Sequence, residues 1–324
     1  MFTQITSFEN LYSAYLGARK CKRYRTSILR FSRNLEENLI SLQRELLART
    51  YKHGGYREFI ISDSKKRLIK APLFRDRVIH HAVCNVVELI FERRFIYDSY
   101  ACRKGKGTHA AVKRLESFVK SLAPAKTYCL KCDISKYFNS IDHEILLGLL
   151  KNKIKNEDVL WLLYEIISSN SQGIPIGNLT SQLFANIYLN ELDHFIKRIL
   201  RERYYIRYMD DFLILSNKKE NLRYDKERIK IFLVERLKLR LHPKKAEIFP
   251  IDKGIDFLGY VVRDSCRFLR KPTVKRFLKK KQQYEKMIKN SKWTEQSFRG
   301  FCDSWRGYAN FANSYKLLEK LGLN

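Results

Sequence analysis

Residues 204–216 read Tyr-Tyr-Ile-Arg-Tyr-Met-Asp-Asp-Phe-Leu-Ile-Leu-Ser and place two adjacent carboxylates between two apolar runs. The aromatic and branched side chains favour strands, and the short polar break predicts a hairpin with Asp210 and Asp211 at its tip. Two like charges side by side repel each other, so a buried pair needs a cationic partner, and hard cations such as Mg²⁺ bind carboxylate oxygens. A solvated Asp-Asp turn is the competing interpretation, because such turns are common.

The overall charge indicates the class of partner. The chain has 324 residues, of which 64 are Lys or Arg and 34 are Asp or Glu, for a formal net charge of +30. Its hydrophobic content of 45% is normal for a globular protein, so the excess positive charge points to nucleic acid. An anionic membrane surface and an acidic protein are the alternatives, but the sequence has no run of about 18 apolar residues to span a bilayer.

The N-terminus and the cysteines predict a cytoplasmic protein. Residues 1–20 lack a basic segment followed by an apolar one, so we expect no secretory signal. The seven cysteines are odd in number and scattered, which fits reduced thiols better than a disulfide framework.

A second hairpin is predicted near the N-terminus. Residues 59–61 and 68–69 are apolar and flank a polar turn, residues 62–67, which carries Lys65, Lys66 and Arg67. These side chains are candidates for binding phosphate. Exposed lysines at a turn are often only solvated, so both interpretations stay open.

Two further segments carry candidate site residues. Residues 128–134 predict a strand with Asp133 near its end, and a carboxylate at the end of a strand is well placed for a site. Residues 172–182 are rich in loop formers and lead into an apolar helix that we expect over 183–199. The N-terminus of such a helix is a natural place for phosphates or a polynucleotide backbone.

The C-terminal part differs from the rest in charge. Residues 263–292 contain twelve basic and two acidic side chains, on a predicted helix with one apolar side and one cationic side. Aromatic residues follow at helical spacing between 298 and 315, a pattern that is more typical of a packed core than of a base-stacking platform. We expect a small helical domain that lays positive charge along a duplex.

Asp133 lies 210 − 133 = 77 residues before Asp210. With Asp211 they make three carboxylates, the set needed to hold two metal ions about 3.5 to 4 Å apart for an in-line displacement. The order of motifs over nearly the whole chain resembles that of the reverse transcriptases. Residues 208–211 match the Y-x-D-D box of that family, and residues 133–138 look like its first catalytic-aspartate motif.

This resemblance implies roles for individual residues. Asp133, Asp210, Asp211 and the backbone carbonyl of Ile134 would hold two Mg²⁺ or Mn²⁺ ions, and Lys245 would protonate the pyrophosphate leaving group. Phe138 would block a ribose 2′-hydroxyl, which implies DNA synthesis. The other residues implied to contact the nucleotide are Lys65, Lys66, Arg67, Ile176, Gly177 and Gln182. Those implied to contact primer or template are Tyr208, Met209, Phe257, Leu258, Gly259, Lys275, Arg276 and Lys279.

The resemblance also implies the fold, an α+β right-hand polymerase whose palm is an antiparallel sheet backed by helices. The expected fingers occupy residues 1–110, with N-terminal helices and the basic-tipped hairpin, and a helical insertion at 141–176. The expected palm occupies 111–140 and 177–262. The expected thumb is the basic helical segment 263–324.

One departure suggests a subgroup. Most members of the family carry a Gln-Gly-x-x-x-Ser-Pro loop beside the nucleotide, whereas residues 176–182 here read Ile-Gly-Asn-Leu-Thr-Ser-Gln. That form is similar to the reverse transcriptases of diversity-generating retroelements. Those enzymes copy a template-repeat RNA into adenine-mutagenised cDNA, which implies a template RNA, a cDNA primer or product, dNTPs and a basic oligomeric accessory protein as partners. An Ile in place of an amide removes a polar contact that enforces geometry, which also favours error-prone synthesis.

Several alternatives remain. A group II intron maturase, a retron enzyme or a defence-associated reverse transcriptase would polymerise without adenine mutagenesis. A catalytically silent RNA-binding scaffold would keep the fold without the reaction, although the three aspartates favour an enzyme.

Overall fold

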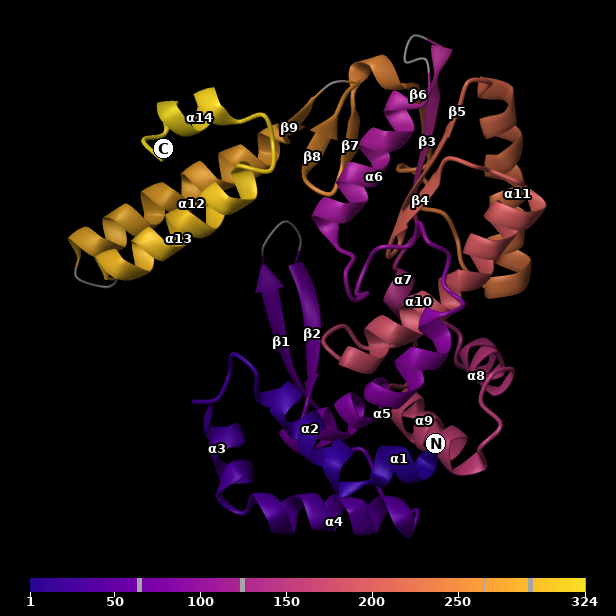
Figure 1. Ribbon diagram of the computed structural model, residues 1–324, viewed down its shortest axis with the longest axis vertical. Coiled ribbons are helices and arrows are strands. Elements are labelled where there is room, and N and C mark those ends of the chain that lie inside the picture. The colour runs from indigo at the N-terminus through magenta and orange to yellow at the C-terminus, as the bar shows by residue number, and fades with distance from the viewer. Residues whose placement is uncertain (63–65, 123–125, 265, 291–293, 324) are drawn as a thin grey trace.

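The structure is a computed structural model, and it describes residues 1–62, 66–122, 126–264, 266–290 and 294–323. Lys65 lies outside the described residues. The chain folds into helices packed around three antiparallel sheets, which confirms the expected α+β class. Figure 1 shows a layer of N-terminal helices, a central sheet with helices on both sides, and a C-terminal helical pair.

The N-terminal layer carries the first hairpin. Its strands pair antiparallel from Tyr56↔Pro72 to Ser62↔Lys66, as the apolar runs predicted. The hairpin rises from the helices toward the C-terminal helical pair (Figure 1). The elements of this layer are α1 (Phe2–Thr6), α2 (Phe8–Arg19), α3 (Thr26–Arg33), α4 (Leu35–Leu47), β1 (Tyr56–Ser62), β2 (Lys66–Pro72) and α5 (Phe74–Glu92).

The central sheet brings together strands that are far apart in the sequence. Its order is β4-β5-β3-β6, and its strands are β3 (Tyr128–Asp133), β4 (Tyr205–Tyr208), β5 (Asp211–Ser216) and β6 (Glu247–Pro250). Side chains alternate between the two faces, so Cys132 packs in the larger hydrophobic core and Cys129 in the smaller one. Both faces of this sheet are therefore buried, which fixes the register of β3 against β5.

Helices cover the sheet on both sides. The larger core includes α10 (Leu179–His194) and α11 (Lys219–Leu237), and the smaller core includes α6 (Thr108–Lys120). The remaining elements between β3 and α11 are α7 (Tyr137–Ser140), α8 (His143–Lys151), α9 (Glu157–Ser168) and the π-helical turn η2 (Phe195–Ile199). The expected start of the helix at residue 183 was four residues too late. Asn178 precedes the first turn in an extended conformation, and Thr180 and Ser181, expected in a loop, are buried in that turn.

The C-terminal part continues from the sheet into a helical pair. A short turn, η3 (Ile251–Lys253), leads to β7 (Ile255–Phe257), β8 (Tyr260–Val262) and β9 (Arg267–Leu269). These strands are followed by α12 (Lys271–Lys289), α13 (Glu295–Ala309) and α14 (Tyr315–Lys320). Phe277 of α12 stacks on Trp305 of α13 with ring centroids 3.9 Å apart, so this part of the aromatic stripe packs as its spacing predicted, whereas Tyr315 is 72% exposed. Within the described residues, no helix is both long and apolar enough to cross a membrane.

Candidate active site

The hairpin β4–β5 presents the two adjacent aspartates at one end of the central sheet. Tyr208 pairs with Asp211, so Met209 and Asp210 form the two-residue turn between the strands. Met209 has φ +56, a left-handed conformation that a non-glycine residue adopts at a cost. This hairpin confirms the strand-turn-strand prediction for residues 204–216.

The pairing of β3 with β5 brings the third aspartate to the same place. Asp133 lies directly opposite Asp211 in the ladder, and the N–H of Ile134 donates to the carbonyl oxygen of Asp210 at 3.3 Å. Three carboxylates from two distant segments of the chain therefore share one end of the sheet.

The three carboxylates disturb one another electrostatically. Burial, which has the largest effect, and the charges of Asp133 and Asp210 together raise the pKa of Asp211 to about 7, although the positive charge of Lys131 opposes them. Burial also raises the pKa of Asp210, and the charge of Asp133 adds to that effect. The positive charges of Lys245 and Arg67 lower the pKa of Asp210. A shared cation would relieve this repulsion.

The donor chemistry fits a hard divalent cation. Oδ1 of Asp211 is buried, and among the described residues it has no hydrogen-bond partner. A buried carboxylate oxygen without a partner is costly unless a cation or donor reaches it. The side chains are not arranged as a closed ligand set: across the described ranges, no three His, Cys, Asp or Glu side chains converge closely enough to hold an ion. Instead, the carboxylate of Asp133 contacts the ammonium of Lys245.

Lys245 is positioned by a loop that is hydrogen-bonded to the end of β3 and the residues that follow it. The N–H of His242 donates to the carbonyl oxygen of Asp133 at 2.8 Å, and the N–H of Ser135 donates to the carbonyl oxygen of Arg240 at 2.9 Å. These bonds hold the loop that carries Lys245 beside the end of β3. The side-chain ammonium can thus stay within reach of the carboxylates.

The expected nucleotide-contacting loop joins two other parts of the site. The N–H of Ile174 donates to the carbonyl oxygen of Phe138 at 2.8 Å, and the N–H of Lys70 on β2 donates to the carbonyl oxygen of Ile176 at 3.0 Å. Phe138 and Ile176 are both half-buried. Main-chain hydrogen bonds thus link the β1–β2 hairpin, the loop and the segment after Asp133.

The remaining residues expected at the nucleotide lie around this loop. Gly177 has φ +127, and an added Cβ would lie 3.0 Å from both Ile69 and the carbonyl oxygen of Lys70. Lys66 and Arg67 are exposed near the end of the hairpin. Gln182 is exposed on the first turn of α10, where it lines a depression shared with α5.

The residues expected at the primer fall into two groups. Tyr208 and Met209 are half-buried in the β4–β5 hairpin, and Leu258 and Gly259 form the turn between β7 and β8. Phe257 is fully buried, so only its main chain is available to a primer. At Gly259 an added Cβ would lie 2.3 Å from the hydroxyl of Tyr308, so this turn packs tightly against α13. On α12, Lys275 and Lys279 are exposed and Arg276 is half-buried.

The sequence patterns did not predict a buried ion pair behind the β4–β5 hairpin. Arg207 of β4 and Asp193 of α10 are 0% exposed, and Nη2 of Arg207 lies 2.6 Å from Oδ2 of Asp193. The signal was present in the quoted stretch, because a charged residue in the middle of a buried strand requires a buried partner.

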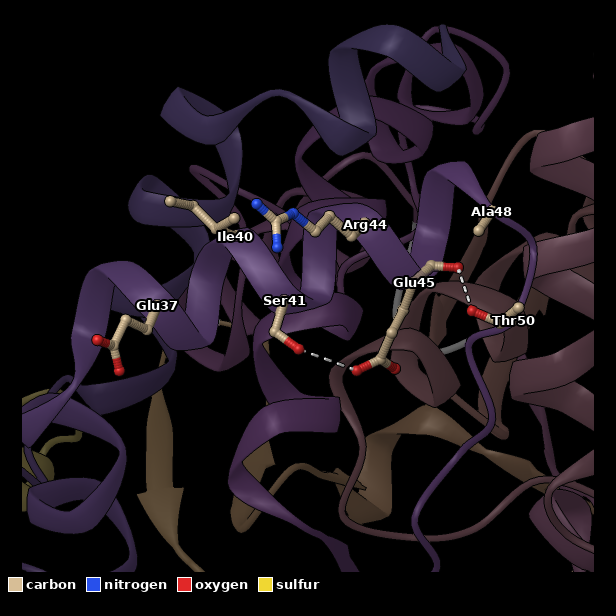
Figure 2. A pocket seen from close by; sticks show the side chains of 7 residues that line it. All are labelled: Glu37, Ile40, Ser41, Arg44, Glu45, Ala48 and Thr50. Atoms are coloured by element: carbon tan, nitrogen blue, oxygen red, sulfur yellow. Dashed lines mark hydrogen bonds between the residues drawn. The ribbon is translucent and has the colours of Figure 1, made fainter.

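A second surface depression lies away from the three aspartates and is lined by none of the expected site residues. It lies along α4, encloses about 420 Å³ and is shown in Figure 2. Glu45 accepts a hydrogen bond from the hydroxyl of Ser41 at 3.4 Å through its side chain, and one from Thr50 at 3.4 Å through its carbonyl. Its lining residues are Glu37, Ile40, Ser41, Arg44, Glu45, Ala48 and Thr50, none of which is expected at the site.

The electrostatics of Asp211 predict a stabilising substitution. In the unfolded chain an aspartate ionises near pH 3.8, whereas in the fold Asp211 ionises at about 7. Ionisation of Asp211 therefore lowers the free energy of unfolding as the pH rises above about 4, and this loss is complete above about pH 7. Each tenfold change in an acid dissociation constant is worth about 1.4 kcal/mol, so Asp211→Asn is expected to stabilise the metal-free protein by about 2 to 4 kcal/mol at pH 8.

Urea unfolding at several pH values between 5 and 8, with divalent cations chelated, measures this difference. The advantage of Asp211→Asn should shrink as the pH is lowered. Asp303→Asn is the control, because that side chain is 61% exposed and pairs with Arg306 on its own helix. A wild-type protein at least as stable as Asp211→Asn at pH 8 would contradict the prediction.

Comparison with known proteins identifies the family. The family described as "Reverse transcriptase (RNA-dependent DNA polymerase)" matches residues 52–262. Protein YkfC of Escherichia coli (strain K12) is 26% identical over 273 residues, covering 70% of this chain and 72% of YkfC. The group II intron-encoded protein LtrA of Lactococcus lactis subsp. cremoris is 28% identical over 303 residues, covering 70% of this chain and 50% of LtrA.

Solved structures show the same fold. Telomerase from Candida albicans, solved with a fragment of telomeric RNA, superposes with a TM-score of 0.56 at 14% identity. The match covers 68% of this chain and 46% of the telomerase chain. This likeness agrees with a right-hand polymerase, while the chain spans only about half the length of LtrA and of telomerase. From the match over residues 52–262, this chain belongs to the reverse transcriptase (RNA-dependent DNA polymerase) family.

Proposed function

We propose that this chain copies a template RNA into cDNA by two-metal-ion nucleotidyl transfer. The observation that carries the proposal is the pairing of Asp133 with Asp211 beside Asp210, which gathers three carboxylates at one end of the central sheet. Two Mg²⁺ or Mn²⁺ ions held by these side chains and the carbonyl of Ile134 would supply activation of a primer 3′-hydroxyl and neutralisation of the triphosphate.

The surrounding residues have proposed roles in this reaction. Lys245, held beside Asp133, would donate its proton to the pyrophosphate as it leaves. Phe138, whose ring meets that of Tyr137 edge-on at 5.6 Å, would exclude a ribose 2′-hydroxyl. The exposed Arg67, together with Lys66 and Lys65, would bind the triphosphate, and Gly177 and Gln182 would complete the nucleotide pocket.

The nucleic acid would lie between the β1–β2 hairpin and the C-terminal helices. Lys275, Arg276 and Lys279 would contact phosphates along the duplex, and the β7–β8 turn would contact the primer end. This arrangement supports the proposed division into fingers (1–110 and 141–176), palm (111–140 and 177–262) and thumb (263–324). The seven cysteines are free, which supports a cytoplasmic location.

We further propose that the cDNA is adenine-mutagenised and diversifies a variable gene region, as in diversity-generating retroelements. Support comes from Ile176, whose half-buried side chain offers no hydrogen bond to a nucleotide, while its carbonyl is used by Lys70. A basic oligomeric accessory protein is the proposed partner. Because this chain carries +30, bridging RNA would hold two basic proteins together.

Primer extension on a defined RNA, followed by sequencing of the cDNA, tests the mutagenesis. We expect errors concentrated opposite template adenines. Equal error rates opposite all four bases would contradict the proposal. Ile176→Gln is expected to lower the error rate opposite adenine at least about fivefold, because one added hydrogen bond is worth about 1 kcal/mol. Ile176→Leu is the matched control, since it alters the shape of the side chain without adding a polar group.

The same experiment distinguishes the second candidate function. LtrA is a group II intron-encoded protein, so its similarity to this chain favours a reverse transcriptase without adenine mutagenesis. In that case Ile176→Gln should leave the spectrum of errors unchanged.

A further inference from the structure

The guanidinium of Arg207 has an acceptor for every one of its donors, although the side chain is fully buried. Nε donates to Oδ1 of Asp193 at 2.7 Å, and Nη2 donates to Oδ2 of Asp193 at 2.6 Å and to the hydroxyl of Ser99 at 3.1 Å. Nη1 donates to Oδ1 of Asn186 at 3.3 Å and to the carbonyl oxygen of Met209 at 3.0 Å. All five N–H groups of the planar fork are therefore used.

The bond to Met209 reaches the turn that carries Asp210. A two-residue hairpin turn with φ above zero at its first residue usually has glycine there, and Met209 has φ +56 instead. A strained conformation persists only where the surrounding structure imposes it. Two hydrogen bonds fix this turn. The guanidinium of Arg207 donates to the carbonyl oxygen of Met209, and the N–H of Ile134, which follows β3, donates to the carbonyl oxygen of Asp210.

Two acceptors of Arg207 belong to a buried part of α10. Asp193 and Asn186 lie on α10, and the side-chain amide of Asn186 donates to the carbonyl oxygen of Ala101 at 2.8 Å. The main chain of Arg207 also accepts from the N–H of Tyr100 at 3.0 Å. Movement of the turn relative to α10 would therefore break several buried hydrogen bonds at once.

Stability alone is a weak reason for such an arrangement. Desolvation of a buried ion pair can exceed the attraction between its charges, and well-packed apolar residues are often at least as stabilising. A planar guanidinium has five donors in fixed directions, so it can fix the position of each acceptor, which an apolar residue cannot do.

We propose that Arg207 is a positioning residue for catalysis, which fixes the Met209-Asp210 turn and thereby the direction in which Asp210 presents its carboxylate. The inference rests on the proposed reverse transcription for its consequence in turnover. Its structural part, the immobilisation of the turn, stands independently of activity.

The test compares two variants that each weaken the same network. Arg207→Lys keeps the charge beside Asp193 but replaces the fork by a single ammonium, so the bond to Met209 is lost. Tyr205→Phe removes the hydroxyl that donates to Oδ1 of Asp193 at 2.6 Å and leaves all five bonds of Arg207 in place. Both variants are expected to lower Tm by several degrees.

Two measurements separate positioning from stability. Arg207→Lys should lower kcat at least about tenfold with KM for dNTP within about threefold, and it should speed hydrogen exchange at the Ile134 amide at least about tenfold. Tyr205→Phe should leave kcat and the exchange of Ile134 within about twofold of wild type. If both variants lose kcat in proportion to Tm, or if the exchange of Ile134 is unchanged in Arg207→Lys, the inference is overturned.

A second variant covers the case in which Arg207→Lys does not fold. The double variant Arg207→Met with Asp193→Leu leaves no uncompensated charge in the core and should show the same loss of kcat and the same faster exchange. A wild-type protein that extends no primer would overturn the proposed function. In that case the exchange of Ile134 alone decides the inference about Arg207.

Discussion

Asp210→Asn is expected to lower the rate of single-nucleotide addition at least about 10³-fold while the protein stays folded. The substitution keeps the shape of the side chain and removes a charge from the shared end of the sheet, where burial and Asp133 already raise the pKa of Asp210. Charge stabilisation by catalytic metal ions is worth several kcal/mol, and about 1.4 kcal/mol corresponds to a factor of ten in rate. Primer extension with one dNTP, under single-turnover conditions, measures the effect.

Two further measurements decide between an enzyme and a silent scaffold. RNA affinity of Asp210→Asn should equal or exceed that of wild type, because one negative charge has been removed near the nucleic acid. Asp303→Asn, which removes an exposed charge on α13, should retain full activity. If the chain were a scaffold that binds RNA without polymerising, wild type, Asp210→Asn and Asp303→Asn would all bind RNA and none of them would extend a primer.

Gly173→Ala is expected to lower kcat/KM for dNTP at least about 30-fold. Gly173 has φ +61, and an added Cβ would lie 2.4 Å from the carbonyl oxygen of Phe138 and 2.6 Å from Cα of Asn139, both backbone atoms. The loop would have to move away from Phe138, which breaks the bond from the N–H of Ile174 to that carbonyl. Because this contact joins the Phe138 segment to the Ile176 loop, the proposed nucleotide pocket would lose one of its walls.

Steady-state kinetics and thermal unfolding test this substitution together. The strain of the left-handed conformation and the steric overlap should also cost about 2 to 4 kcal/mol of stability. Gly148→Ala is the matched control on nearby α8. In the part of the chain that the structure describes, its added Cβ meets no atom within 4 Å, and Ala favours a helix by up to about 1 kcal/mol over Gly. Unchanged kinetics in Gly173→Ala would contradict the proposed pocket.

The parts of the site that could be predicted are those set by local patterns. The two apolar, β-prone runs around Asp210 and Asp211 predicted a hairpin, and a strand ending at Asp133 predicted another carboxylate in a similar setting. Their meeting depends on the pairing of β3 with β5, which the resemblance implied but no local pattern specifies. The cationic helix α12 was predictable for the same local reason, since its charges and apolar positions recur at helical spacing.

Other features depend on contacts that are distant in the sequence. The place of Arg207 in an apolar strand requires a buried partner, but it does not indicate which residue that is, and the structure shows it to be Asp193, fourteen residues earlier on another element. The role of Gly173 is set by the carbonyl of Phe138, 35 residues away. The π-helical turn η2 forms the last five residues of the segment 183–199, which was expected to be a single helix.

The order of the central sheet also constrains how the chain folds during synthesis. Strand β3 lies between β5 and β6, and both of these come later in the chain. When β3 leaves the ribosome neither of its edges has a partner, and the last residue of β6 follows Asp133 by 250 − 133 = 117 residues. At about 5 to 20 residues per second, the edge of β3 that pairs with β6 stays unpaired for roughly 6 to 23 s. Until β5 has been synthesised, the nascent chain cannot pair Asp133 with Asp211, so the proposed metal site cannot form before translation has passed the β4–β5 hairpin.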